Sequence, residues 1–447
     1  MLFSDKIGKI LKNVLPAPFT IAVILTFLTI LIAFFISADS YNSKNFFEIL
    51  SFWEKGLWDN NLMVFALQMM LMLVLGHSLA LSKPISKIIN NITIHCNNTA
   101  NAAAIVTFTT LLVAFFNWGL GLIFGAIFAR KVGEHASKNN IPLNYPLIGA
   151  AGYSGLMIWH GGISGSAPIK IAEQGHFLAE KIGTISQAET IFSAMNVTIS
   201  LSLIVILPLF MFFLAKKTKS ELVNIIEVEK IEKIKLDGAE KIDHSNLIAY
   251  IFGGIIIIYC FYKAILLPDK MTLNFITPNF INLSLLGLCV ILHKNFFQFI
   301  KSVDSAIKGA SGILIQFPLY FGIMGIMKDA GMIELMSDLF ISISNENTFP
   351  IFTFFSAGLV NIFVPSGGGQ WAIQGPIIVE AAMKLGVSIP KSVMSLAYGD
   401  QITNMLQPFW ALPLLGITGL KAKEILPYTL LLMLLGGVIF ITGLLIF

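Results

Sequence analysis

Residues 159–168 read Trp-His-Gly-Gly-Ile-Ser-Gly-Ser-Ala-Pro, and residues 365–370 read Pro-Ser-Gly-Gly-Gly-Gln. Both stretches are rich in glycine and serine, and both interrupt apolar segments. A loop exposed to lipid cannot lie at membrane depth, because hydrocarbon offers its N–H and C=O groups no hydrogen-bond partners. Such interruptions are stable only where they line a cavity inside the protein. Two of them at related positions in two halves of a chain are typical of a transporter's binding site.

The rest of the chain has the composition of a membrane protein. Of its 447 residues, 56% are hydrophobic and 12% are charged, whereas about a quarter of a soluble domain is charged. We therefore predict an all-α polytopic membrane protein. It is not a soluble domain anchored by a single helix, because the chain has no long polar region. Several windows reach the ~20 apolar residues that span a bilayer: 19–36, 194–214, 247–267 and 428–446.

Composition also bounds the partners. The formal net charge is only +4, and basic residues on a membrane protein mostly mark its cytoplasmic side, so we expect a lipid bilayer and no nucleic acid as partner. Cys96, Cys260 and Cys289 are widely spaced and form no CxxC motif. No cluster of histidine, cysteine and carboxylate predicts a metal site. We expect no cofactor other than Na⁺ or H⁺ as a coupling ion.

The positive-inside rule orders the spans. Lys6, Lys9 and Lys12 place the N-terminus in the cytoplasm, and a base-poor outer loop is expected around residues 39–59. Residues 102–130 are apolar yet lie between two basic clusters. A re-entrant hairpin that enters and leaves by the cytoplasmic face, with its tip at residues 117–121, keeps both clusters inside. The same rule, followed to the end, places the C-terminus in the periplasm.

The same order of elements occurs twice with opposite orientation: span, span, hairpin, broken span, span. Inverted repeats of this kind place a binding site near the midplane between the copies. Each hairpin has an alternative interpretation as two short true spans. The predicted division is a first repeat at 1–214 (hairpin about 102–130, broken helix about 145–171), a charged cytoplasmic linker at 215–246, a connecting transmembrane helix at 247–274, and a second repeat at 275–447 (hairpin about 349–383, broken helix about 393–415).

The breaks are candidate anion sites. A half-helix N-terminus exposes unpaired N–H groups and carries about +0.5 charge, so it binds anions without a positive side chain. No Arg or Lys lies within any break, which favours a small, singly charged carboxylate over a dicarboxylate or phosphate. The alternative is that Gly and Ser only permit close helix packing. The candidate substrate-binding residues are Asn117, Gly119, Gly121, Ser164, Gly165, Ser166, Ser366, Gly367, Gly368, Gly369, Gln370 and Gln407.

Few ionisable side chains lie inside the spans, where a charge is costly. Asp400 lies in the first half of the last broken span and is a candidate for coupling to a cation or proton; a water-paired carboxylate near the outer mouth is the alternative. Asn404, Asn361 and His160 are further coupling candidates. Aromatic residues gather at the breaks, where they would wall a short acyl tail or form an interfacial belt: Trp118, Trp159, Trp371, Phe409 and Trp410.

An enzyme is a remote alternative. Residues 162–165 match the GxSG of rhomboid-type intramembrane serine proteases. Such a protease needs a histidine on another helix within hydrogen-bond reach of the serine, and His77 is the one candidate in a clear span. This interpretation leaves the matching breaks of the second half without a role, so we expect no enzyme. An anion channel stays open, because sequence separates channels from carriers poorly.

Several motifs together carry a family resemblance: Leu-Pro-Ala-Pro-Phe at 15–19, Gly-His-Ser-Leu-Ala at 76–80, Phe-Asn-Trp-Gly-Leu-Gly at 116–121, Gly-Ile-Ser-Gly-Ser at 162–166, Pro-Ser-Gly-Gly-Gly at 365–369 running on to Gln-Gly-Pro at 374–376, and residues 404–414 with Gln-Pro-Phe-Trp-Ala-Leu-Pro. On these residues the chain resembles the bacterial short-chain fatty acid transporters of the acetoacetate-system permease type, over nearly its whole length. His160 departs from the pattern, since a small residue is expected there.

The resemblance implies a secondary carrier that takes up short-chain fatty acids, such as acetoacetate or butyrate, across the bacterial inner membrane. It also implies similarity to a wider ion-transporter superfamily, in which two hairpins and two broken helices form a mobile transport domain beside a scaffold. Members of that superfamily are typically dimers with an elevator motion, so we expect a homodimer. A carrier for other organic anions, such as dicarboxylates, is the alternative.

Overall fold

The computed structural model describes residues 18–36, 43–172, 174–176, 178–223, 225, 238, 240–266, 275, 278–365 and 367–447. The described residues form helices and no strand; Leu143 and Glu221 make one isolated bridge. These findings confirm the prediction of a helical, multi-pass membrane protein. Among the described residues, six helices are long and apolar enough to cross a membrane: Phe19–Ile36, Leu62–Leu79, Thr99–Phe116, Ala194–Lys216, Asn246–Leu266 and Ala422–Ile446.

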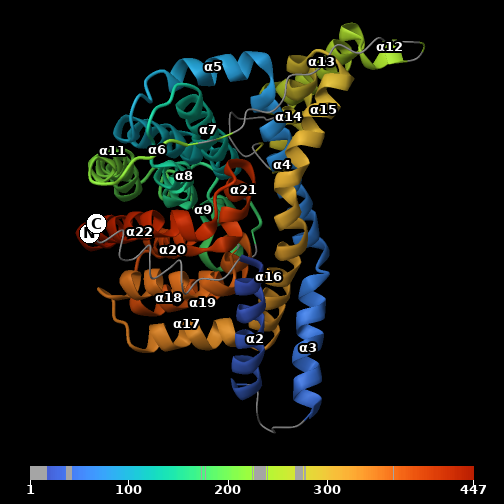
Figure 1. Cartoon of the computed structure of the whole chain (residues 1–447). Coiled ribbons are helices and arrows are strands. Elements are labelled where there is room, and N and C mark those ends of the chain that lie inside the picture. Colours follow the sequence, from blue (N-terminus) through green and yellow to red (C-terminus); the bar gives the residue numbers. More distant parts are fainter. Residues whose placement is uncertain are drawn as a thin grey trace.

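One group of helices forms tall columns on one side of the molecule (Figure 1). In it α3 leads into α4, α15 leads into α16, and α16 packs along both α2 and α3. The large hydrophobic side chains of α2 and α13 are mostly exposed, as on a surface that faces lipid. The members are α2 (Pro18–Ile36), α3 (Ser43–Leu57), α4 (Asn60–Leu81), α13 (Asn246–Phe261), α14 (Pro278–His293), α15 (Phe296–Ala306) and α16 (Ser311–Asp329).

Helix α3 occupies most of residues 39–59, so the expectation that these residues form a loop was wrong. The segment is an amphipathic helix. Its charged residues make it too polar, and it is too short, for its hydropathy to indicate a transmembrane span. The apolar side packs tightly on α16: a Cβ at Gly56 would overlap the carbonyl oxygen of Phe321, and one at Gly325 would overlap that of Phe52. Small residues at such a crossing let two helix backbones approach closely.

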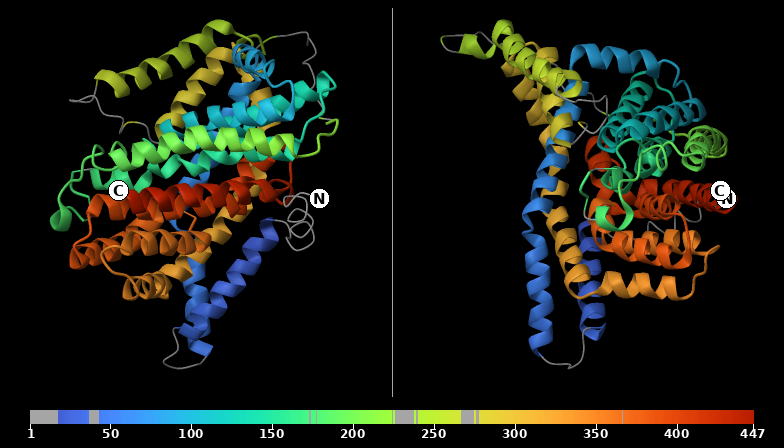
Figure 2. Two further views of the ribbon diagram at one scale, coloured as in Figure 1. Left: turned by 90° about the vertical axis from the view of Figure 1, so that its left-hand side faces the viewer. Right: turned by 180° about the vertical axis from the view of Figure 1, so that it is seen from behind.

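A second group of helices lies beside the columns and contains both breaks (Figures 1 and 2). In each half of the chain, the chain turns back between two consecutive helices. An interrupted helix follows, and a long helix ends the set. The first set is α6 (Thr99–Phe116), α7 (Trp118–Lys138), α8 (Tyr145–Tyr153), α9 (Ser166–Ala172) and α11 (Ala194–Lys216); the second is α18 (Phe349–Phe363), α19 (Gly367–Leu385), α20 (Ile389–Thr403), α21 (Pro408–Thr418) and α22 (Ala422–Ile446). Four shorter helices complete the connections: α5 (Lys83–Thr93), α10 (Ala179–Ile182), α12 (Glu240–Asp243) and α17 (Met332–Ser342).

Asn117 makes the turn between α6 and α7. Its backbone is extended (φ −150°, ψ 125°), it ends α6, and its side-chain oxygen accepts from the Leu120 N–H of α7 at 2.9 Å. One residue therefore acts as C-cap and N-cap. The predicted tip of five residues is thus too long, because α7 begins already at Trp118. Beside the turn, a Cβ at Gly121 would overlap the Ala114 backbone, so glycine lets the two helices touch.

The interrupted helices are broken differently. After α8 the backbone tightens into 3₁₀ turns at Ser154–Met157 and Trp159–Gly161 before α9 begins at Ser166. After α20 a 3₁₀ turn at Asn404–Leu406 leads to Gln407, which is extended because proline follows it. The predicted Ser366 and residues 224, 226–237 and 239 of the predicted linker at 215–246 lie outside the described residues.

Candidate functional site

A buried side-chain pair joins the two halves of the chain. His160, in the interruption before α9, lies with Nδ1 2.5 Å from the Oδ2 oxygen of Asp400 on α20, and the two side chains are 0% and 1% exposed. The other ring nitrogen, Nε2, accepts from the backbone N–H of Ala167 at 3.1 Å. A ring nitrogen that accepts carries no proton. The imidazole is therefore neutral and donates its Nδ1 proton to the carboxylate.

The N-terminus of α19 approaches this pair. Gly367 is the first residue of α19, and a Cβ on it would lie 2.7 Å from the Trp159 ring, 2.8 Å from the His160 ring and 3.2 Å from Oδ2 of Asp400. Glycine permits this approach because it has no side chain. Since the N-terminus of a helix carries about +0.5 charge, α19 favours a negative charge at this place. The anion that it faces here is the protein's own carboxylate.

Polar side chains hold the backbone of the interruption in place. The N–H of His160 donates to Oε1 of Gln401 at 2.8 Å. Asn196 on α11 donates from Nδ2 to the Gly161 carbonyl at 2.8 Å and accepts from the Tyr398 hydroxyl at 2.9 Å. Sequence reasoning missed Gln401, Asn196 and Tyr398. The available signal was a polar side chain inside an apolar span, which is rare without a partner.

Asn361 at the end of α18 ties the second hairpin to the second broken helix. Its Nδ2 donates to the Asp400 carbonyl at 2.6 Å, to Oγ1 of Thr403 at 2.9 Å and to Oδ1 of Asn404 at 2.7 Å. Its carbonyl accepts from Nε2 of Gln407. Thus Asn361, Asn404 and Gln407, all predicted from the sequence, meet behind the backbone of Asp400.

This node predicts a large stability effect. Asn361→Ala leaves the Asp400 carbonyl and the Asn404 side chain without their donor, and each buried polar group left unpaired costs about 1–3 kcal/mol. We expect the free energy of unfolding to fall by about 2–4 kcal/mol in total. Thermal unfolding of the detergent-solubilised protein measures it. Asn139→Ala, which removes an exposed amide bonded to its own helix, is the control; equal melting of the two variants would contradict the assignment.

The N-terminus of α7 is already capped by protein atoms. The Trp118 N–H donates to Oγ of Ser164 at 2.9 Å, and the Leu120 N–H donates to Asn117, as described above. Ser164 thereby links the first hairpin to the interruption before α9. Gly119 faces the other way, because a Cβ there would overlap the sulfur of Met72 on α4.

Some of the remaining predicted residues lie close to the His160–Asp400 pair or to Ser166, whereas Gln370 does not. Gly165 lies under the His160 carbonyl, which a Cβ would overlap, and a Cβ at Gly368 would lie 3.9 Å from Ser166. Gln370 turns away from the pair: its Nε2 donates to the Ala357 carbonyl and to Gln374, each at 2.9 Å. It therefore fastens α19 to α18. Gly369 lies in the first turn of α19.

Three of the five predicted aromatic residues form a wall beside the pair. Trp159 stacks on the His160 ring at 4.4 Å between centroids. Trp118 lies 5.9 Å from Trp159 and 5.4 Å from Trp410. Phe409 instead stacks on Phe317 of α16 at 3.9 Å. The fifth, Trp371, is buried in a separate apolar cluster.

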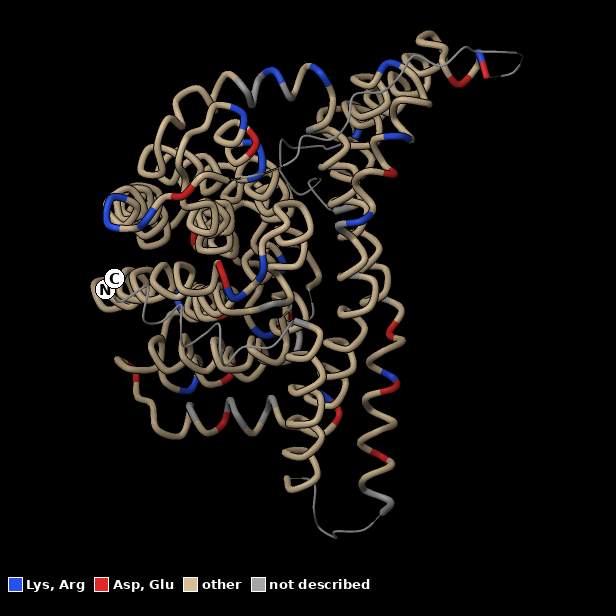
Figure 3. The backbone as a smooth tube through the Cα atoms, viewed as in Figure 1, with Lys and Arg blue, Asp and Glu red and all other residues tan. Residues whose placement is uncertain are grey.

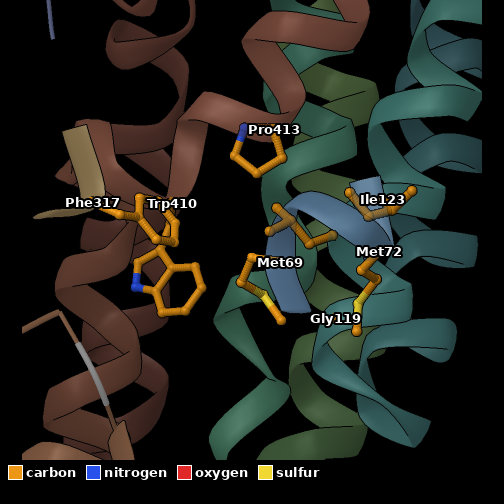
Figure 4. A pocket seen from close by; sticks show the side chains of 8 residues that line it. Met69, Met72, Gly119, Ile123, Phe317, Trp410 and Pro413 are labelled. Carbon is orange, nitrogen blue, oxygen red and sulfur yellow. The ribbon is translucent and has the colours of Figure 1, made fainter. Parts of the chain in front are cut away.

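A small apolar pocket lies on the far side of this wall, between the two groups of helices (Figure 4). Figure 4 shows Trp410 and Phe317 on one side of it, and Met72, Gly119 and Ile123 on the other. No charged residue lines it in the part of the chain that the structure describes. Its lining comes from α4, α7, α16 and α21: Met69, Met72, Gly119, Leu122, Ile123, Phe317, Trp410 and Pro413.

Charged positions are sparse along the helices that meet at the His160–Asp400 pair (Figure 3). Arg130 of α7 is bonded elsewhere: it donates to Glu134 at 2.9 Å and to the Ile417 carbonyl at the end of α21 at 2.8 Å. Lys170 on α9 is exposed. Among the described residues, no Arg or Lys forms an ion pair with Asp400. The positive partial charge next to Asp400 is that of the N-terminal peptide groups of α19.

Two solved structures resemble the fold. The YdaH transporter of Alcanivorax borkumensis matches with a TM-score of 0.46 and 12% identity, over 96% of this chain and 97% of the other. MtrF of Neisseria gonorrhoeae, described in a study of antimetabolite efflux pumps, matches with a TM-score of 0.44 and 13% identity, over 98% and 97% of the two chains.

Sequence relatives are closer than these structures. Proteins of Escherichia coli K12 and Haemophilus influenzae, each named "Putative short-chain fatty acid transporter", are both 36% identical to this chain. The alignments cover 97% and 96% of this chain, respectively, and 96% of each relative. The family model described as "Short chain fatty acid transporter" matches residues 2–447. The chain therefore belongs to the short-chain fatty acid transporter family.

Proposed function

We propose that this protein is a secondary active transporter that carries short-chain monocarboxylates, such as acetoacetate or butyrate, across the bacterial inner membrane. Its family consists of transporters and not enzymes. One structural observation carries the substrate class: the positive end of α19 reaches a buried place to which no described residue brings a cationic side chain. Such a site suits one carboxylate, because a second negative charge would have no partner.

The carboxylate binds beside Gly367, where the N-terminus of α19 meets the interruption before α9. Gly368 is exposed at this end of the helix, and Ser166 lies across from it. Ser164 accepts from Trp118 and keeps its own hydroxyl hydrogen available as a donor. Asp400, Asn404, Asn361 and His160 are the coupling-ion candidates.

The acyl tail lies on the tryptophan wall and extends toward the apolar pocket that Met72 lines. We expect Met72→Ala to widen this pocket, so that the transport ratio of hexanoate to butyrate rises about tenfold, the lower end for one or two methylene groups in an apolar pocket. Counterflow of a homologous series of labelled acids measures the ratio. Met70→Ala, a neighbour on α4 outside the pocket lining, should leave the ratio unchanged; an unchanged ratio in Met72→Ala would contradict the tail site.

The transport cycle is of the elevator type, with the helices of the second group moving along the columns. Inverted repeats and re-entrant hairpins are part of this proposal, with the N-terminus in the cytoplasm and the C-terminus in the periplasm. The apolar contact of α4 and α16 with α7 and α21 supports it. Across an apolar interface, the second group of helices can move along the columns without breaking ion pairs. A homodimer would hold the columns still.

The test uses purified protein in liposomes. Labelled acetoacetate outside is exchanged for unlabelled acetoacetate inside, without any ion gradient, and Na⁺ and pH gradients are then imposed separately. The proposal predicts saturable counterflow that short monocarboxylates inhibit and dicarboxylates do not. Conduction under voltage without counterflow would identify an anion channel, and counterflow of dicarboxylates alone would identify a different anion carrier.

A further inference from the structure

We infer that Asp400 carries the coupling ion as a proton, and that the protonated Oδ1 atom donates a hydrogen bond to the substrate carboxylate, giving a symport of one proton per monocarboxylate. This inference rests on the proposed function. It selects H⁺ over Na⁺ and assigns the step to one atom.

The first argument is the state of the Asp400 oxygens. Oδ2 accepts from His160, whereas Oδ1 is buried without a hydrogen-bond partner among the described residues. A buried carboxylate oxygen without a partner is costly. Protonation removes the negative charge and gives Oδ1 a hydrogen, which then needs an acceptor. A substrate carboxylate supplies that acceptor, so binding of the proton and binding of the substrate favour each other.

The second argument is charge. The empty pair consists of a neutral imidazole and a carboxylate, with a net charge of −1, at the place where α19 favours one negative charge. A second carboxylate entering beside Asp400 meets a like charge in a site of low dielectric, which disfavours ionisation of both. One proton from water on the open side converts the pair to net charge zero. The substrate then takes over the negative charge, and the loaded site carries −1 as the empty one did.

The third argument is the neighbourhood. Across the helices packed against the pair, α6 and α18 bring no titratable side chain. Tyr398 donates its hydroxyl to Asn196, away from the pair, and Glu380 and Lys384 bond to each other. The pair is therefore the one buried acid–base group at this place among the described residues. The other titratable groups on these helices are Lys170, Lys391, Lys423, Glu424 and Tyr428.

His160 is a positioning residue in this scheme. Its ring is fixed by the stack on Trp159 and by the Ala167 N–H, and its Nδ1 proton holds Oδ2 so that Oδ1 remains for the substrate. A hydrogen bond to the charged form of a carboxylate favours that form. His160→Phe keeps a flat ring but removes the donor, so the pH profile of counterflow should move to higher pH.

The experiment measures acetoacetate in proteoliposomes, with protein-free liposomes to subtract passive entry. In wild-type protein, we expect accumulation when the inside is more alkaline. Apparent affinity should rise about tenfold per pH unit as the pH falls, while Asp400 is ionised in the empty protein. Asp400→Asn mimics the protonated acid, so it should keep counterflow but lose both accumulation and pH dependence. Asp304→Asn, the same change at an exposed site on α15, should behave as wild type.

A second measurement does not depend on any variant folding. A pH-sensitive dye in weak buffer should report one proton taken up per acetoacetate bound to the wild-type protein. No proton uptake on binding, accumulation driven by Na⁺ alone, or pH-driven accumulation by Asp400→Asn would each overturn the inference. Absence of counterflow in the wild type would instead refute the proposed function, so the two failures are distinguishable.

Discussion

Gly367→Ala should reduce transport about 100-fold, the cost of moving a positioned group by about 1 Å, while the protein still inserts and folds. The added methyl group would lie 2.7 Å from the Trp159 ring and 2.8 Å from the His160 ring. Both rings are buried and stacked on one another, so neither yields cheaply. The N-terminus of α19 must then retreat from the Asp400 carboxylate. Counterflow of acetoacetate in liposomes measures the loss.

Gly254→Ala is the control, since it makes the same change in α13, outside the proposed binding site. An added Cβ there meets nothing within 4 Å. Transport by this variant should stay within about twofold of wild type, the scale of a few tenths of a kcal/mol at a site without a clash. Near-normal transport by Gly367→Ala would show that the substrate does not use the end of α19.

Gly125→Ala should strongly destabilise the fold. A Cβ at Gly125 on α7 would overlap the carbonyl oxygen of Gly152 on α8, and it would lie 2.8 Å from Cγ2 of Thr110. Backbone atoms cannot rotate away as a side chain does, so α7 and α8 must separate. We expect the free energy of unfolding to fall by about 3 kcal/mol, the upper end for overpacking. Thermal unfolding in detergent measures it.

Gly254→Ala on α13 is the comparison for that variant. An added Cβ there meets nothing within 4 Å, and alanine favours a helix over glycine by about 1 kcal/mol. This variant should melt at or above the wild-type temperature. If Gly125→Ala melted at the same temperature as Gly254→Ala, the close crossing of α7 and α8 would not contribute to stability.

The sequence located the interruptions well because their signal is local. Glycine, serine and proline within apolar segments mark where a helix cannot continue, and the structure ends helices at Asn117, after Tyr153 and at Thr403. The same local reasoning failed at α3. Its charged residues lower the mean hydropathy of the segment, so the sequence does not reveal a helix there. The structure shows that this segment is a helix whose Gly56 packs on α16.

The partners within the site were beyond sequence reasoning. His160 and Asp400 are 240 positions apart, and each looked like an isolated ionisable residue until the fold brought them together. Ser164 was predicted to bind the substrate, and the sequence did not show that its oxygen also accepts from Trp118 and holds the first hairpin. Gln370 shared a motif with Gly367 yet binds α18. Spacing along the chain does not show which side of a helix faces the other half of the chain.

An experimental structure with bound acetoacetate tests the central claim most directly. That claim is that oriented peptide groups, and no positive side chain, hold the substrate carboxylate. The account predicts carboxylate density at the N-terminus of α19, beside Gly367 and Asp400, with the tail against Trp159. Density for the carboxylate on the side chain of Arg130, Lys131 or another cation, with the end of α19 unoccupied, would contradict it.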